Sequence, residues 1–289
     1  MIVVLTQFLL YYQVILPALQ AQKIMPALTQ VQFFLLTLIT AFITAGGYII
    51  NDIIDLKIDI INKPDKIIIG RRIARQTAHW LYFCVNLAGF VLSLYLAYEA
   101  QRIPLLFLFP TAVTGLLLYS IVLKRRPLWG NLLVSFYCAG VAAIVWVAEA
   151  KALTQLPIID YQKVIHLLLY YAVFAFLSTL FREIVKDLED AQGDAAGGAR
   201  TAPVVWGERF VKQIAMGTGI LLLLFLAYMG YALQEILTVW AYIFIAILAS
   251  LIIIGEWQLF KATRKLHYYQ LSQFSKIIML GGILLLLFF

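Results

Sequence analysis

Residues 31–59 read VQFFLLTLITAFITAGGYIINDIIDLKID, an apolar run that ends in a cluster of acids. The apolar part is long enough for a helix to cross the ~30 Å hydrocarbon core of a bilayer. At its end come Asp52, Asp55 and Asp59. A carboxylate at the edge of lipid is costly unless a positive group balances it. We therefore expect a cationic partner for these three aspartates.

The composition indicates an integral membrane protein. Hydrophobic residues make up 63% of the 289 positions, against about 45–50% in soluble domains. Because backbone groups cannot stay unpaired in lipid and the runs lack the alternation of barrel strands, we expect transmembrane helices. The runs of spanning or near-spanning length are 1–19, 31–53, 78–98, 103–123, 130–149, 164–185, 212–233, 236–255 and 275–289. The predicted fold is an all-α, polytopic bundle of nine helices, the last one short, forming one domain over residues 1–289.

The 22 Lys and Arg residues predict how the chain lies across the membrane. Most of them follow the second, fourth, sixth and eighth runs, and the positive-inside rule assigns those connections to the cytoplasm. The N-terminus and the acids after the second run are then cytoplasmic, at the plasma or inner membrane of a prokaryote. The net charge of +7 follows from this topology and suits anionic headgroups, so no nucleic-acid partner is expected.

A second acidic cluster repeats the spacing of the first. The segment REIVKDLEDAQGD (182–194) places Asp187, Asp190 and Asp194 three and four residues apart. At about 100° per residue, such a trio lies within about 60° of one helix face. Glu183, one turn earlier, extends the stripe, whereas Glu189 points elsewhere. Two helices therefore each carry a stripe of carboxylates where they leave the membrane.

Paired carboxylate stripes on one membrane face favour a divalent cation. Like charges one turn apart destabilise a helix unless a cation neutralises them. Mg²⁺ prefers oxygen ligands and usually binds one or two carboxylates together with substrate phosphates. Two facing stripes would thus hold Mg²⁺ and a diphosphate between them. The simpler alternative, solvated faces neutralised by neighbouring Lys and Arg, is disfavoured by the repeated spacing at a membrane edge.

The two motifs together resemble those of the UbiA family of intramembrane prenyltransferases. NDIIDLKID (51–59) is similar to the family's NDxxDxxxD after the second helix, and KDLEDAQGD (186–194) to its DxxDxxxD after the sixth. YSIVLKRRPLWGN (119–131) and GDAAGGARTAPVVWG (193–207) resemble two further family segments. Residues 182–194 are most similar to the branch that alkylates geranylgeranylglyceryl phosphate. NKPDKIIIGR (62–71) departs from the family's NRPxRPIPSG by lacking two prolines and a Ser-Gly pair.

The resemblance implies Mg²⁺-dependent transfer of a prenyl group from an isoprenoid diphosphate to a lipophilic acceptor of the geranylgeranylglyceryl phosphate type. Lysines and arginines would donate to phosphate oxygens, and a tyrosine face would stabilise the allylic cation. The implied catalytic and metal-binding residues are Asp52, Asp55, Asp59, Asp187, Asp190 and Asp194. The implied substrate-binding residues are Asn51, Lys66, Tyr119, Lys124, Asn131 and Arg182. Lys124 has an alternative interpretation as an ordinary marker of the cytoplasmic side.

Two other functions stay open from the sequence. The acceptor is an aromatic ring in one alternative, as in the 4-hydroxybenzoate, naphthoate or haem type of prenylation. A cation transporter is the other, although transporters place ionisable groups near the bilayer midplane and these acids lie at one surface. No P-loop, dinucleotide fingerprint or Ser-His-Asp pattern is evident, and no obligate protein partner is implied.

Three further residues receive structural interpretations. Cys84 and Cys138 lie within apolar runs and lack metal or redox spacing, so we expect buried thiols. Glu149 falls at the far side of the membrane from the acidic motifs, where we expect an ordinary charge at a helix end.

Overall fold

The computed structural model describes residues 2–62 and 64–288, with positions 57, 62 and 66 described by their backbone alone. Its helices are α1 (Ile2–Leu9), α2 (Leu16–Ala21), α3 (Gln30–Asn62), α4 (Arg75–Glu99), α5 (Ile103–Ile121), α6 (Trp129–Leu153), α7 (Ile158–Ala196), α8 (Ala202–Trp206), α9 (Glu208–Ala232), α10 (Val239–Lys261) and α11 (Lys265–Leu284). A π-helical turn, Leu10–Ile15, joins α1 to α2. Within the described ranges, β structure is limited to one isolated bridge between Ile69 and Ile73. The all-α prediction is confirmed.

Nine helical stretches of the described chain are long and apolar enough to cross a membrane, as predicted. The expectation of a short last crossing is wrong, because that stretch runs from Lys265 to Phe288 and has 24 residues. Polar side chains near the start of this helix interrupt its apolar run, so the sequence pattern underestimates its length. Two of them, Ser272 and Ser275, are buried against the bundle, so they face protein instead of lipid.

The helices α3 and α7 are longer than a bilayer requires. They contain 33 and 39 residues, which correspond to about 50 and about 58 Å of helix against a hydrocarbon core of ~30 Å. Both acidic motifs lie near the C-terminal ends of these helices. The extra turns therefore carry the carboxylates beyond the lipid without breaking the helix.

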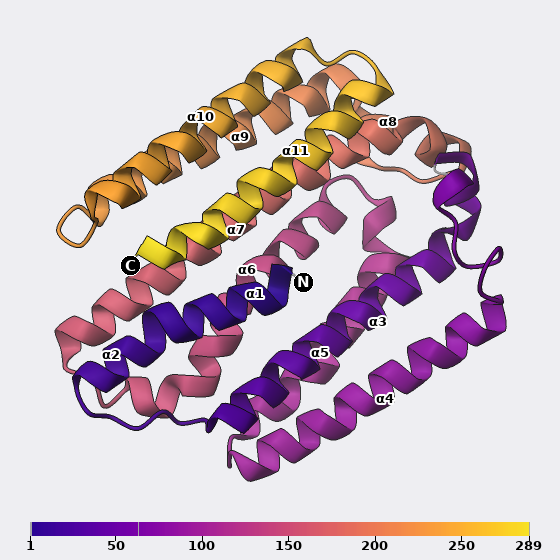
Figure 1. Ribbon diagram of the computed structural model, residues 1–289. Coiled ribbons are helices and arrows are strands. Elements are labelled where there is room, and N and C mark those ends of the chain that lie inside the picture. The colour runs from indigo at the N-terminus through magenta and orange to yellow at the C-terminus, as the bar shows by residue number, and fades with distance from the viewer. Residues whose placement is uncertain (1, 63, 289) are drawn as a thin grey trace.

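The helix α7 lies at the centre of the bundle (Figure 1). It packs against α6, α9 and α11, while α3, α4 and α5 form a second group that touches α7 through α3. The helix α10 packs on α9 and α11. This arrangement brings the second and sixth crossings side by side, which the prediction of facing acidic stripes requires.

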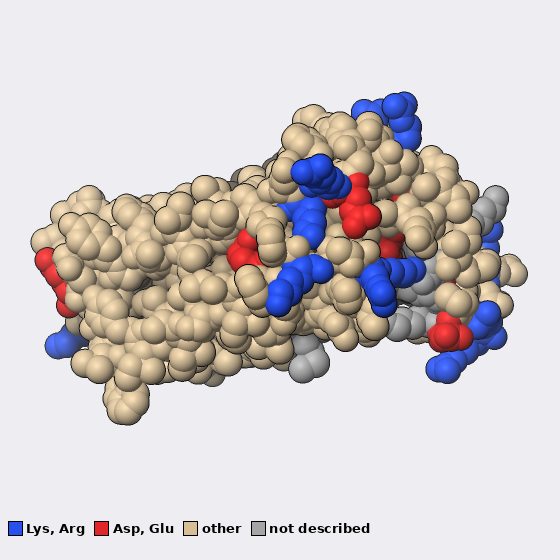
Figure 2. All heavy atoms as spheres, turned by 90° about the horizontal axis from the view of Figure 1, so that it is seen from above, with Lys and Arg blue, Asp and Glu red and all other residues tan. Residues whose placement is uncertain are grey.

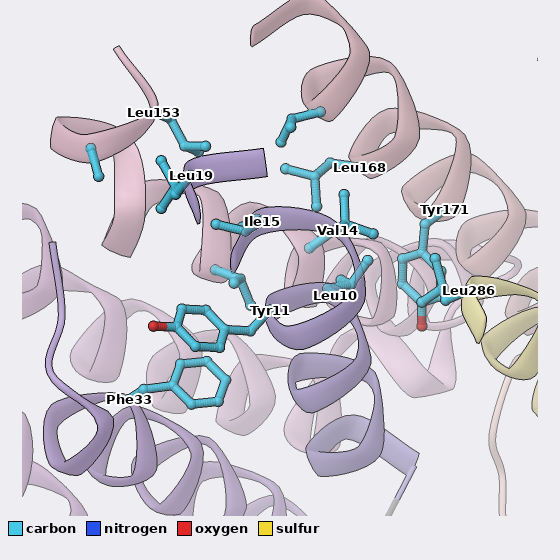
Figure 3. Packing of buried hydrophobic residues seen from close by; sticks show 14 of the residues in the cluster. Leu10, Tyr11, Val14, Ile15, Leu19, Phe33, Leu153, Leu168, Tyr171 and Leu286 are labelled. Carbon is cyan, nitrogen blue, oxygen red and sulfur yellow. The ribbon is translucent and has the colours of Figure 1, made fainter. Parts of the chain in front are cut away.

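The first crossing is a packed part of the bundle and not a peripheral anchor. Leu10, Ile15 and Leu19 are fully buried. The ring of Tyr11 stacks on that of Phe33 in α3 with centroids 3.9 Å apart, a contact that Figure 3 shows among the surrounding aliphatic side chains. Stacked aromatic pairs add to the energy of burial. The first crossing is therefore tied to α3 near the middle of the bundle.

Glu149 in α6 is completely buried, so its interpretation as an ordinary helix-end charge is wrong. Its carboxylate accepts hydrogen bonds from the backbone N–H groups of Ala27, at 2.7 Å, and Leu28, at 3.1 Å. These two residues precede α3, so the carboxylate fixes the loop that leads from the first crossing into α3. Buried polar groups of this kind need such partners.

The outer surface of the bundle is apolar, as expected where lipid replaces water. Exposed large side chains include Trp80, Phe107 and Trp240. Cys84 is also exposed and Cys138 only partly buried. The expectation of buried thiols is wrong for Cys84, because an apolar run alone does not reveal which face of its helix meets lipid.

Candidate active site

The two acidic stripes line one cavity, open to solvent, at the ends of α3 and α7. From α3 come Asp55 and Asp59, and from α7 come Asp187, Asp190 and Asp194. Figure 2 shows acidic and basic side chains gathered toward one end of the molecule, while most of the remaining surface in view is uncharged. The structure thus brings together five of the six predicted aspartates. Asp52 is exposed and lies outside the cavity lining.

Lys124 gives Asp55 of the first stripe a positive partner, at a place where the sequence predicts Mg²⁺. It lies in the 3₁₀ segment Leu123–Arg125, between α5 and α6. Its Nζ forms an ion pair with Asp55 and donates a hydrogen bond to Oδ1 of Asn51, at 3.1 Å. Asp55 is only 3% exposed, so this ammonium balances a carboxylate that water hardly reaches. Two predicted substrate-binding residues, Asn51 and Lys124, therefore meet at the cavity.

Asn131 is a hydrogen-bond partner of the second stripe. Its Nδ2 donates to Oδ2 of Asp187 at 2.9 Å, and the asparagine is buried. Gly130 makes this approach possible, because a Cβ there would lie 2.9 Å from the Cα of Lys124 and 3.1 Å from the ring of Tyr119. The start of α6 therefore packs closely against Lys124 and Tyr119, which line the cavity. An asparagine amide at this place orients one carboxylate oxygen and leaves the other for a ligand.

The cavity also contains residues outside the predicted set. Lys186, Arg125 and Glu183 line it together with Tyr119, which was predicted. Lys186 lies one turn from both Glu183 and Asp190, so the spacing of the acidic stripe could have identified it. Arg125 could not be singled out from its basic neighbours by sequence pattern.

The other predicted residues have separate positions. Arg182 forms an ion pair with its neighbour Glu183 at the edge of the cavity. The side chain of Lys66 lies outside the described residues. Glu189 accepts a hydrogen bond from Ser272 of α11 at 2.9 Å and, as predicted, points away from the stripe.

The segment after α7 closes the cavity. A Cβ at Gly197 would lie 2.6 Å from Cγ1 of Ile58, so only glycine allows the end of α7 to approach α3 this closely. The backbone N–H of Arg200 then donates to the carbonyl of Arg125 at 3.1 Å. The cavity is therefore bounded by segments from three distant parts of the chain.

The carboxylates fit a metal that takes few protein ligands. Across the part of the chain that the structure describes, no three Asp, Glu, His or Cys side chains converge closely enough to complete a metal site. The carboxylates instead lie along one cavity, and Lys and Arg side chains lie between them. Mg²⁺ suits this arrangement, because it commonly takes one or two carboxylates and completes its octahedron with water and substrate phosphates.

The profile of the UbiA prenyltransferase family matches residues 11–276. The chain belongs to the UbiA prenyltransferase family. The match runs from the first crossing into the last, so it includes both acidic motifs and the connection that carries Lys124.

Two curated relatives of this UbiA family chain are both named digeranylgeranylglyceryl phosphate synthase. The protein from Methanoculleus marisnigri is 36% identical over 61% of this chain and 57% of the relative. The protein from Methanopyrus kandleri is 31% identical over 78% of this chain and 79% of the relative. The matched region thus spans less than two thirds of the first relative's length and more of the second.

Solved structures of UbiA homologues share the fold. The apo structure from Aeropyrum pernix K1 aligns with a TM-score of 0.67 at 15% identity, covering 98% of this chain and 96% of that one. The structure from Archaeoglobus fulgidus bound to GPP and Mg²⁺ aligns with a TM-score of 0.54 at 16% identity, with the same coverage. At such identities the likeness concerns the fold alone.

Proposed function

We propose that this protein is a Mg²⁺-dependent prenyltransferase that moves a prenyl group from an isoprenoid diphosphate to a lipid acceptor of the geranylgeranylglyceryl phosphate type. The observation that carries the proposal is the single cavity in which carboxylates from α3 and α7 face Lys124 and Lys186. The names of the relatives from M. marisnigri and M. kandleri support the lipid acceptor. The whole chain, residues 1–289, acts as one domain.

The aspartates of both stripes hold the diphosphate end of the donor through Mg²⁺. When bound, Mg²⁺ supplies a fixed positive charge that stabilises negative charge on the departing diphosphate. The residues assigned to this work are Asp55, Asp59, Asp187, Asp190 and Asp194, which line the cavity, together with Asp52, which lies one turn before Asp55 and outside the lining. Asn131 keeps Asp187 oriented, and Lys124 limits the repulsion within the first stripe.

The basic side chains bind the diphosphate directly. Lys124 and Arg182 each already pair with a carboxylate at the cavity, so each can exchange part of that contact for a phosphate oxygen. Lys66 and the amide of Asn51 complete the proposed diphosphate contacts. Holding these charges in place before the reaction avoids the cost of reorganising them during it.

Bond cleavage and formation then follow at the apolar side of the cavity. The allylic C–O bond breaks, its electron pair leaves with the diphosphate, and the allylic carbon becomes cationic. Tyr119, which lines the cavity, offers a ring face to this cation. The hydroxyl oxygen of the acceptor forms the new C–O bond, and its proton passes to the departed diphosphate. Exclusion of water from the apolar side protects the cation until then.

The active site faces the cytoplasm in this proposal, and the N-terminus lies on the same side. The distribution of Lys and Arg supports this orientation. Labelling of single cysteines introduced at Arg126, near the cavity, and at Lys151, at the opposite end of α6, tests it in intact cells. Selective labelling at position 126 by an impermeant reagent added from outside would refute it.

Pyrophosphate release in membranes tests the function itself. Geranylgeranyl diphosphate is supplied with Mg²⁺ and either geranylgeranylglyceryl phosphate, 4-hydroxybenzoate or a naphthoate. We expect release and product with the ether-lipid phosphate. Product formed only on an aromatic ring would refute the acceptor class. If no donor and acceptor pair gives release, while Asp55→Ala or Asp190→Ala changes ion flux, the protein is a transporter.

A further inference from the structure

We propose that Tyr171 and Phe174 of α7 form a partition that limits the length of the prenyl tail this protein accepts, an inference that rests on the proposed function. The partition separates two small, mostly apolar pockets that open between the helices of the bundle. Both residues line both cavities, and among the described residues they are the two that the linings share.

One face of α7 lines the polar cavity and then, in turn, the two apolar ones. Glu183 and Asp187 line the polar cavity, and Thr179, one turn below Glu183, lines the first apolar cavity. Beyond the partition, Leu167 lines the second. The rise from Asp187 to Phe174 is about 20 Å along the helix. A tail that leaves the diphosphate along α7 therefore enters the first cavity and reaches the partition before it reaches the second.

Two contacts hold the partition in place. The hydroxyl of Tyr171 shares a buried hydrogen bond of 2.8 Å with Oγ1 of Thr6 in α1. The ring of Phe174 lies directly on Gly282 of α11, where a Cβ would come within 1.8 Å of Cε1. Figure 3 shows the ring of Tyr171 beside Leu286, in the 3₁₀ segment Leu285–Phe288 that follows α11. Because both rings are packed against neighbouring helices, a longer tail must displace them against close-packed side chains.

The glycine gives two opposite perturbations of the same ring. Phe174→Ala removes the ring and joins the two cavities. Gly282→Ala pushes the ring away from α11 and into the space beside it, because the added methyl would overlap Cε1. The first change is expected to extend the range of tail lengths, and the second to shorten it.

A matched control exists elsewhere in the bundle. Phe109 of α5 lies on Gly89 of α4 in the same manner, since a Cβ at Gly89 would be 2.4 Å from Cε2 of that ring. Neither residue lines the apolar cavities described above. Phe109→Ala and Gly89→Ala thus repeat the loss of a buried ring and the steric push without touching the partition.

The experiment measures equilibrium binding and pyrophosphate release for geranyl, farnesyl, geranylgeranyl and farnesylgeranyl diphosphates in lipid nanodiscs. Relative to wild type, Phe174→Ala should bind the first donor beyond the wild-type limit about tenfold more tightly, which is about 1.4 kcal/mol. Gly282→Ala should bind the longest donor that wild type accepts about tenfold more weakly and keep geranyl diphosphate within about twofold. The two control variants should keep the wild-type length profile.

The outcomes separate this inference from the proposed function. Binding with a length limit that the partition variants shift, but without pyrophosphate release, supports the partition and refutes the transferase. Release with a length profile that Phe174→Ala and Gly282→Ala leave unchanged refutes the partition alone. Failure of wild type to bind any donor overturns both. If Phe174→Ala does not fold, Gly282→Ala decides, since it retains the ring.

Discussion

Replacement of Lys124 alone should destabilise the protein more than replacement of both Lys124 and its partner Asp55. Asp55 is 3% exposed, so Lys124→Met leaves a buried carboxylate without its ammonium. Breaking a fully buried pair from one side costs about 3–5 kcal/mol. Because the Lys124 side chain is 30% exposed, water compensates in part, and we expect about 2–3 kcal/mol in the free energy of unfolding.

A double variant tests whether the unpaired carboxylate causes this loss of stability. Lys124→Met combined with Asp55→Asn has no uncompensated charge at this position, and its stability should return to within about 1 kcal/mol of wild type. The coupling energy between the two changes is then about 1–2 kcal/mol or more. Unfolding in mixed micelles without Mg²⁺, followed by the fluorescence of the six tryptophans, measures all four proteins.

Lys212 provides the control for this cycle. Its Nζ donates to the backbone carbonyls of Phe260 and Ala262, at 2.9 and 2.7 Å, and to no carboxylate in the described contacts. The effects of Lys212→Met and Asp55→Asn on the free energy of unfolding should therefore be additive within about 0.5 kcal/mol. If Lys124→Met and Asp55→Asn are just as additive, the ion pair does not stabilise the cavity and the reasoning is wrong.

Three further predictions follow from other contacts. Asn131→Ala should lower turnover about 10–100-fold, because Asp187 loses the donor that orients it. The Mg²⁺ concentration needed for half-maximal activity should rise, and an unchanged Mg²⁺ titration would contradict this role. Glu149→Gln should cost about 1–3 kcal/mol of stability, because the amide replaces one of the two accepting oxygens with an NH₂ donor, which cannot accept from the N–H of Ala27 or Leu28. Turnover of the folded variant should be unchanged. EDTA should abolish pyrophosphate release and added Mg²⁺ should restore it, so release that persists in EDTA would exclude the metal.

The sequence predicts the parts of this molecule that depend on local patterns. Apolar run length locates the crossings, and the three-and-four spacing of two acidic trios predicts that both stripes lie on helix faces at the same end of the bundle. Lys124 is predicted as a phosphate-binding residue because its segment resembles a family motif, and its ion pair with Asp55 is a finding of the structure. The roles assigned to these residues stay predictions, while their proximity is a finding of the structure.

Tertiary contacts account for what the sequence leaves out. Glu149 looks like a helix-end charge until the loop before α3 folds over it and donates two N–H groups. The last crossing looks short until the polar side chains at its start turn toward the bundle. Whether Cys84 meets lipid or protein depends on the rotation of α4, which buries Gly89 and Ser93 and leaves Cys84 with its neighbour Phe83 on the exposed face.

The pairing of Lys124 with Asp55 also bears on how the chain is made. Both residues belong to the first four crossings and the connection that follows them, which leave the ribosome before α7 does. The early half of the protein can therefore neutralise its own buried carboxylate while the second acidic helix is still untranslated. Chains generally fold from the N-terminal side during synthesis, so Asp55 can already have its ammonium partner in this partly synthesised intermediate.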